Sequence, residues 1–279
     1  MPVEDASRAP ARPAGPGRDR RAATTTAPSR PVWRAALIAV SVAVLVAAWV
    51  YGSTVFPTYI LPGPRAVSES FASAWSRGVW VFEVTATLGH MVIAFGITLG
   101  VGLPIGIVIG RSWVAEELTR VTLIFLQTVP TIVLIVLALV VIGTNDTGVV
   151  VVTAASCFTY FTLNIIQGTR AIDQDLIEMG RAYGAGERAL MRSVLLPSVV
   201  PYFLAASRIT LGVAWQVTLF SEYLMGTRGV GFQVSSAIKL LDTASVFQWG
   251  LSIVLLTIAF EYGVFRPVER FLTRHTRRD

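Results

Sequence analysis

Six apolar stretches divide this chain, and each approaches or exceeds the roughly 20 residues that an α-helix needs to cross a bilayer. They lie at about 35–51, 84–110, 118–142, 149–166, 199–220 and 246–265. Only 14% of the residues are charged, whereas soluble globular chains carry about 25%. The pattern predicts an all-α polytopic membrane protein with six transmembrane helices.

The two ends of the chain differ from these stretches in composition. Residues 1–31 are rich in Pro, Ala, Arg and Thr and show no apolar periodicity, which predicts a disordered tail. A first transmembrane helix over 32–53 should be retained, because no small-residue cleavage site follows its long basic flank. We expect a core transmembrane domain over 84–265 and a basic tail over 266–279.

Basic residues are distributed unequally between the segments that connect these stretches. With the N-terminus inside, 18 Lys and Arg residues fall in cytoplasmic segments and 4 on the opposite side. Because such residues collect on the cytoplasmic side, both termini and the loop 173–197 should be cytoplasmic. The net charge of +6 is then a consequence of topology, and we expect no nucleic-acid partner.

The loop 173–197 is polar and bounded by apolar stretches. A D-x-x-E pattern at 175–178 predicts a helix start, and Gly184 predicts the end of that helix. A second short helix over about 187–196 should stop at Pro197. The apolar face of the first helix comprises Leu176, Met179, Gly180 and Tyr183.

Two residue types are too scarce for certain kinds of site. Lys239 is the only lysine, and it does not stand in the G-x-x-x-x-G-K-[ST] pattern of a phosphate-binding P-loop. Any ATP site should therefore lie on another subunit. Cys157, the only cysteine, lies in an apolar stretch, so we expect neither a disulfide framework nor a cysteine metal site.

The loop 173–197 resembles the EAA motif of ABC-importer permease subunits, and it is hereafter called the coupling loop. That motif reads Glu-Ala-Ala, three residues, Gly, nine residues, Ile, one residue, Leu-Pro. The aligned positions are Glu178, Met179, Gly180, Gly184, Val194, Leu196 and Pro197. Met179 and Gly180 replace the two alanines of the motif, and Val194 replaces its isoleucine. LPGP at 61–64, SRITLGVAW at 207–215 and SEYLMGTRGVGF at 221–232 resemble the nitrate, sulfonate and taurine branch, so the resemblance covers about residues 60 to 270.

This resemblance implies a type I ABC-importer permease fold in a bacterial plasma membrane. Such permeases pair, here most simply as a homodimer, and each EAA loop docks on an ATPase subunit dimer that binds ATP and Mg. A substrate-binding protein delivers cargo from outside. The branch implies a small anion such as nitrate, an aliphatic sulfonate or taurine, but relatives also carry vitamin precursors. The chain itself would be no enzyme and would hold no cofactor.

Other classes of function are less well supported by the residues. A stand-alone secondary transporter usually shows internal repeats and acidic residues at mid-bilayer, whereas the acids here lie near span ends. A membrane enzyme needs clustered His, Asp, Glu or Cys, and this chain has only two histidines.

Polar residues inside apolar stretches are the candidates for a translocation pathway. They are Gln127, Thr131, Arg208, Gln216 and Glu222. Arg208 could instead extend to the interface or pair with another helix, and Glu222 could pair with an arginine of a neighbouring span. His90 is interpreted as a hydrogen-bonded packing residue.

Two glycine patterns leave alternatives open. G-x-x-x-G spacings at 96–100, 102–106 and 106–110 are typical of close helix packing, either within the chain or at a dimer face. Gly226, Gly229 and Gly231 predict a flexible outer loop before a short helix at 235–241. That loop could be an outer gate, a contact for a binding protein or a plain surface loop.

Overall fold

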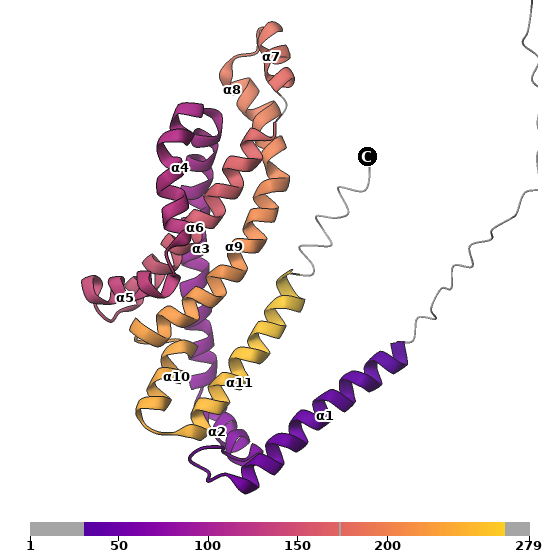
Figure 1. The fold of residues 1–279 in the computed structure, drawn as a ribbon, viewed down its shortest axis with the longest axis vertical. Helices are drawn as coiled ribbons and strands as arrows, with labels where there is room; N and C mark the ends of the chain where they lie inside the picture. Colours follow the sequence, from indigo (N-terminus) through magenta and orange to yellow (C-terminus); the bar gives the residue numbers. More distant parts are fainter. Residues whose placement is uncertain (1–30, 173, 266–279) are drawn as a thin grey trace, which may run out of the picture. The chain divides into compact units, whose positions relative to one another are not determined.

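The computed structural model describes residues 31–172 and 174–265, and within these ranges the chain is helical without a strand (Figure 1). The chain divides into two compact units, residues 1–47 and 48–279, and α1 (Pro31–Val55) runs from the first into the second. The predicted tails 1–31 and 266–279 lie outside the described residues, apart from Pro31.

The second unit contains the remaining helices. In chain order they are α2 (Pro64–Ser76), α3 (Val79–Arg111), α4 (Trp113–Thr128), α5 (Thr131–Ile142), α6 (Asp146–Arg170), α7 (Gln174–Ala182), α8 (Glu187–Leu190), α9 (Leu196–Met225), α10 (Val230–Lys239) and α11 (Thr243–Phe260). Two π-helical turns, Met191–Leu195 and Glu261–Phe265, precede α9 and follow α11. Five helical stretches in the described ranges are long and apolar enough to cross a membrane, or six if α4 and α5 form one span. The predicted all-α architecture is confirmed.

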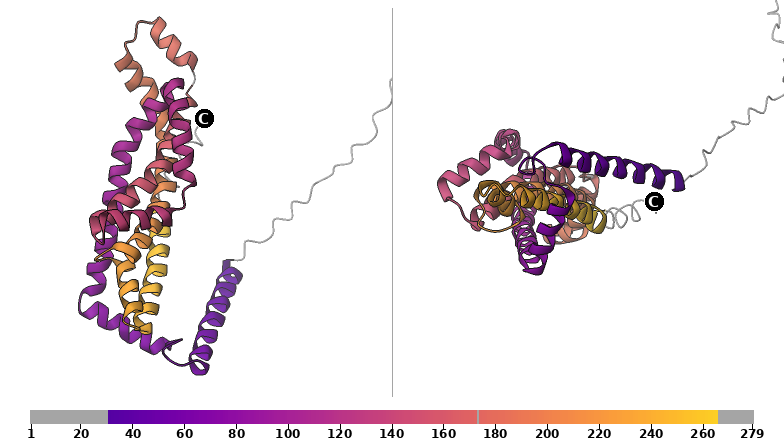
Figure 2. Two further views of the ribbon diagram at one scale, coloured as in Figure 1. Left: turned by 60° about the vertical axis from the view of Figure 1, so that its left-hand side comes forward. Right: turned by 90° about the horizontal axis from the view of Figure 1, so that it is seen from below.

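The helices α3, α6 and α9 pack on one another and form the core of the second unit (Figure 2). Phe161 and Ile165 of α6 are completely buried between them. A Cβ added at Gly106 of α3 would lie 2.7 Å from the Cβ of Ile165, so glycine is what permits this close approach. A Cβ at Gly96 or Gly100 would meet no atom within 4 Å. The glycines at 102–110 therefore serve packing inside the chain.

The third apolar stretch differs from the single helix that we predicted over about 118–142. It is broken into α4 and α5, whose axes differ by 91°. Val129 adopts an extended conformation, with ψ of 122°, immediately before Pro130. Proline disfavours the helical conformation of the preceding residue and lacks a backbone N–H, so the chain turns here instead of bending gradually.

Candidate functional site

The first helix of the coupling loop, α7, ends as the glycine pattern predicted. Gly184 has φ of +75°, and its N–H donates to the carbonyl of Arg181 at 2.9 Å. The N–H of Ala185 donates to the carbonyl of Gly180 at 2.9 Å, which completes a Schellman motif. Asp175, predicted to cap this helix, lies within its first turn instead.

The second helix of the coupling loop does not stop at Pro197, and that prediction was wrong. α8 runs through the π-helical turn Met191–Leu195 directly into α9, and Pro197 lies in the first turn of α9. The widened turn accommodates a residue that has no N–H to donate. The end of the coupling loop is therefore continuous with a core helix.

Most of the predicted apolar face of α7 is exposed. The side chains of Leu176, Met179 and Tyr183 are 44%, 54% and 86% exposed. Gly180 turns inward instead, because a Cβ there would lie 2.5 Å from the Cδ2 atom of Leu190. Ile177, which the pattern did not single out, packs against the core cluster.

The remaining EAA positions lie on both sides of this junction. Glu178 is exposed on α7, and Val194 packs against the same core cluster as Ile177. Leu196 and Pro197 are exposed at the start of α9. The motif therefore spans the exposed helix α7, the glycine turn that follows it and the start of the core helix α9.

Glu187 holds the coupling loop against the bundle. Its Oε2 accepts from Nη2 of Arg111 at 2.7 Å, and its Oε1 accepts from Nη2 of Arg181 at 2.9 Å. The guanidiniums of Arg111 and then Arg181 hold the pKa of the Glu187 carboxyl below its ordinary value. Sequence alone could not find this link, because Arg111 ends α3 and lies 76 positions away.

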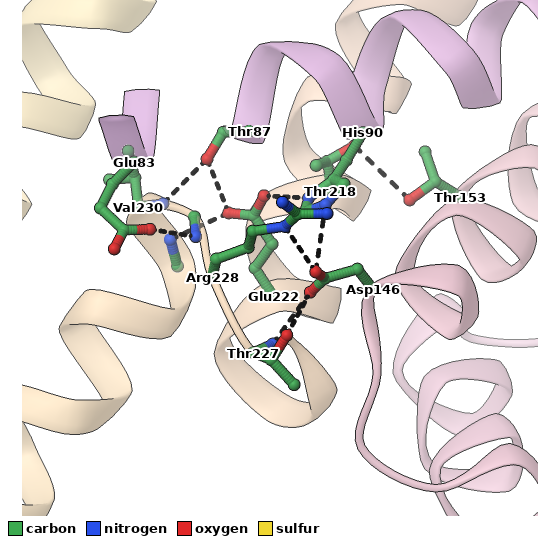
Figure 3. A network of polar contacts seen from close by, with 12 residues as sticks. Glu83, Thr87, His90, Asp146, Thr153, Thr218, Glu222, Thr227, Arg228 and Val230 are labelled. Carbon is green, nitrogen blue, oxygen red and sulfur yellow. Dashed lines mark hydrogen bonds and ion pairs between the residues drawn. The ribbon is translucent and has the colours of Figure 1, made fainter. Parts of the chain in front are cut away.

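A second polar cluster, hereafter the α10 cage, surrounds the start of α10 (Figure 3). Three consecutive backbone amides donate to side chains of neighbouring helices. Gly229 donates to Oε2 of Glu83 at 2.6 Å, Val230 to Oγ1 of Thr87 at 2.8 Å, and Gly231 to Oε2 of Glu222 at 3.1 Å. These are first-turn amides that lack partners within the helix, and negative groups are favourable there.

Glycine is required at two positions of the α10 cage. Gly229 has φ of +107°, and a Cβ there would lie 2.2 Å from Cδ of Glu222. A Cβ at Gly231 would lie 2.3 Å from the carbonyl oxygen of Leu219. The predicted flexible outer loop is therefore a closely packed segment, in which glycine admits the carboxyl group of Glu222.

Glu222 is completely buried within the cage. Its Oε1 lies 2.8 Å from Nδ1 of His90, and its Oε2 accepts from Oγ1 of Thr87 at 2.8 Å. The prediction that Glu222 pairs with an arginine of a neighbouring span was wrong, because its partner is His90 of α3. The interpretation of His90 as a hydrogen-bonded packing residue is confirmed.

Asp146, at the start of α6, extends the cage to a third helix (Figure 3). Its carboxyl accepts from the N–H of Thr227 at 3.0 Å and from Nε of Arg228 at 2.6 Å. Nε2 of His90 lies 3.9 Å from Oδ2 of Asp146. The segment between α9 and α10 is thus attached to α3, α6 and α9 together.

The remaining pathway candidates lie at different places. Gln127 is exposed on α4, Thr131 is half-buried at the start of α5, and Arg208 is half-buried in α9. Gln216 is exposed on α9 and lines a cavity of about 340 Å³ between α9, α10 and α11. Neither Arg208 nor Glu222 lines this cavity.

Comparisons with known proteins agree with this arrangement. Residues 102–265 match the family described as binding-protein-dependent transport system inner membrane component. The taurine transport system permease protein TauC of Escherichia coli (strain K12) is 25% identical over 241 residues, which cover 84% of this chain and 87% of that protein. The riboflavin transport system permease protein RibX of Chloroflexus aurantiacus is 29% identical over 245 residues, which cover 87% and 91%.

The fold is similar to that of a solved transporter. A chain of the inward-facing MetNI methionine ABC transporter superposes with a TM-score of 0.59 at 21% identity, covering 71% of this chain and 97% of that chain. The family match covers more than half of the 279 residues. The chain therefore belongs to the family of binding-protein-dependent transport system inner membrane components, the permease subunits of ABC importers.

Proposed function

We propose that the coupling loop of this permease is the docking site for a separate ATPase subunit. The observation that carries the proposal is the exposed apolar surface of α7, formed by Leu176, Met179 and Tyr183. α7 is too short and too polar to cross a bilayer, so this surface needs a partner outside the membrane core. A hydrophobic groove of an ATPase is such a partner, and the alternative is a helix that rests on the lipid surface.

The connections of the loop support transmission of movement. α8 continues through the π-helical turn into α9, so a displacement of α8 is passed along a continuous helix. Glu187 also joins the loop to Arg111 at the end of α3. In this proposal ATP and Mg bind on the ATPase dimer, and closure of that dimer moves two helices of the permease core.

The partners follow from the same proposal. Two copies of the permease form the pathway between them, a substrate-binding protein docks at the end of the bundle opposite the coupling loop, and the complex lies in a bacterial plasma membrane with both permease termini in the cytoplasm. The basic-residue asymmetry of the sequence supports this orientation.

The proposed cargo is a small anion such as nitrate, an aliphatic sulfonate or taurine, and the alternative is another small organic solute. A relative named for taurine supports an anion such as a sulfonate. A relative named for riboflavin supports the alternative of a vitamin or its precursor. Uptake of labelled taurine, nitrate and riboflavin into vesicles that contain the permease, ATPase and binding protein would separate these classes.

The docking proposal is tested by matched substitutions of exposed leucines. Leu176→Arg should weaken association with the partner ATPase at least about tenfold, because it places a charge in an apolar contact. Leu240→Arg, at the turn that follows α10, should leave association unchanged, although Leu240 is more exposed. Co-purification and ATP-dependent uptake provide the measurements. Intact association of the Leu176→Arg variant with the ATPase would overturn the proposal. If α7 rests on the lipid surface instead, the same substitution should weaken the binding of α7 to the membrane.

A further inference from the structure

The cavity between α9, α10 and α11 has a chemical character of its own. Its walls include the aromatic side chains of Trp215, Phe220 and Tyr223, and aliphatic residues of α10 and α11 complete them. No charged residue of the described chain lines it. Its volume of about 340 Å³ lies within the range of pockets that hold small organic ligands.

One wall of the cavity is rigidly positioned. Nε1 of Trp215 donates to Oγ1 of Thr257 at 3.0 Å. The indole ring also stacks on Phe260, with ring centroids 5.7 Å apart and planes 15° apart. The Trp215 ring is therefore fixed in orientation before any ligand arrives, which lowers the entropy cost of binding against it.

Among the described residues, two lining side chains have hydrogen-bonding groups without a partner, namely the amide of Gln216 and the hydroxyl of Tyr223. The hydroxyl of Thr257 accepts from Trp215 and donates to the carbonyl of Ile253 at 2.7 Å. An amide offers one acceptor and two donors, which matches the ring nitrogens and carbonyls of a heterocycle. An unpartnered amide would be unfavourable against lipid tails, so this position favours a polar ligand group over an acyl chain.

The electrostatics of the cavity disfavour an anion. A sulfonate or carboxylate in an apolar site loses its hydration and needs a cation or several donors in return. The unoccupied polar groups of the described lining are the Gln216 amide and the Tyr223 hydroxyl, and the lining holds no cation. A flat aromatic ring instead stacks favourably against Phe220 and Tyr223, which are 60% and 37% exposed.

We infer that this cavity binds an uncharged planar heterocycle of the transported solute, with aromatic stacking on Phe220 and hydrogen bonds to the Gln216 amide. The inference rests on the proposed transport function and narrows its cargo to ring-containing solutes. Gly231 lines the cavity and also belongs to the α10 cage. A displacement of α10 would therefore alter the cavity at the same time as it alters the cage.

The test measures ring binding to the purified full-length permease in nanodiscs, without ATPase or binding protein. The probe is riboflavin, followed by fluorescence anisotropy, and lumichrome competes as the ring alone. Phe220→Ala and Gln216→Leu should each raise Kd about tenfold. Phe125→Ala is the matched control, since Phe125 is 65% exposed on α4, outside the cavity, and its loss should leave Kd unchanged.

The outcomes separate this inference from the proposed function. Three results would each overturn the inference. They are no binding of riboflavin, the same Kd for every variant, and displacement of riboflavin by taurine that Phe220→Ala weakens as much as it weakens riboflavin binding. A phospholipid that co-purifies with the chain and is lost in Phe220→Ala, without ring binding, would assign the cavity to lipid. The proposed function fails separately, if vesicles with the complete transporter show no ATP-dependent uptake of any solute.

Discussion

The carboxyl group of Glu222 on α9 lies 2.8 Å from Nδ1 of His90 on α3, and both side chains are buried. This contact joins two core helices at the point where α10 begins. The same carboxyl accepts from the backbone of Gly231, so one side chain fixes three elements. Replacement of this carboxyl group should therefore loosen more than one contact.

Glu222→Gln should lower the unfolding temperature of the purified permease. The free energy of unfolding should fall by about 1–3 kcal/mol. An amide in place of the carboxyl group can direct an NH₂ group at the Thr87 hydroxyl and the Gly231 N–H, which both need an acceptor. Glu69→Gln is the control, because Glu69 forms only an exposed pair with Arg65 and should cost less than about 1 kcal/mol. Equal unfolding temperatures for the two variants would contradict the buried role of Glu222.

Gly229→Ala should disrupt the α10 cage more severely than a typical glycine substitution. The new Cβ would occupy the position of the Glu222 carboxyl, at a φ of +107° that L residues rarely adopt. Gly89→Ala on α3 meets no atom within 4 Å and should be neutral or slightly stabilising. Yield of monodisperse protein and unfolding temperature would reveal the difference, and normal behaviour of Gly229→Ala would refute the packed arrangement.

Gly184→Val should impair the coupling loop. A β-branched residue at φ of +75° costs roughly 1–2 kcal/mol, and it would disturb the end of α7 rather than the membrane core. Gly186→Ala is the control, since Gly186 has φ of −70° and open space around it. ATPase association and ATP-dependent uptake should fall for Gly184→Val alone, while unfolding of the bundle stays the same in both.

Accessibility of α9 to water distinguishes a pathway from a lipid-facing surface. In a Cys157→Ala background, Gln216→Cys should react with a membrane-impermeant thiol reagent in the assembled transporter. Thr218→Cys, two residues further along the same helix, should stay unreactive because Thr218 is completely buried. Protection of the cysteine at position 216 would count against an aqueous path along this face.

Several features of the fold could be predicted from periodicity because they depend on short segments. The apolar stretches predicted the helices, and Gly184 predicted the end of α7. The break at Pro130 was missed, because the stretch 118–142 is largely apolar and the angle of 91° between α4 and α5 depends on what each helix packs against. Pro197 was expected to end a helix, since the π-helical turn that accommodates it has no clear sequence signature.

The candidate sites divide in the same way. The EAA spacing located the coupling loop, but Glu187 was missed because its partner Arg111 is distant in sequence. Glu222 was predicted to line a pathway or to pair with an arginine, and its contacts with His90 and the start of α10 were missed. The sequence signal that could have indicated the α10 cage is the G-V-G pattern at 229–231, which follows an acidic residue at the end of an apolar stretch.

The amino-acid sequence by itself determined that this chain is a helical membrane protein with a polar coupling loop, since hydrophobic periodicity, basic-residue asymmetry and motif spacing are local properties of the chain. The tertiary structure alone decided which polar residues meet. Glu83, Thr87 and Glu222 converge on α10 only because α3 and α9 pack closely, and in an apolar interior every buried carboxyl must find donors from whichever helices lie beside it.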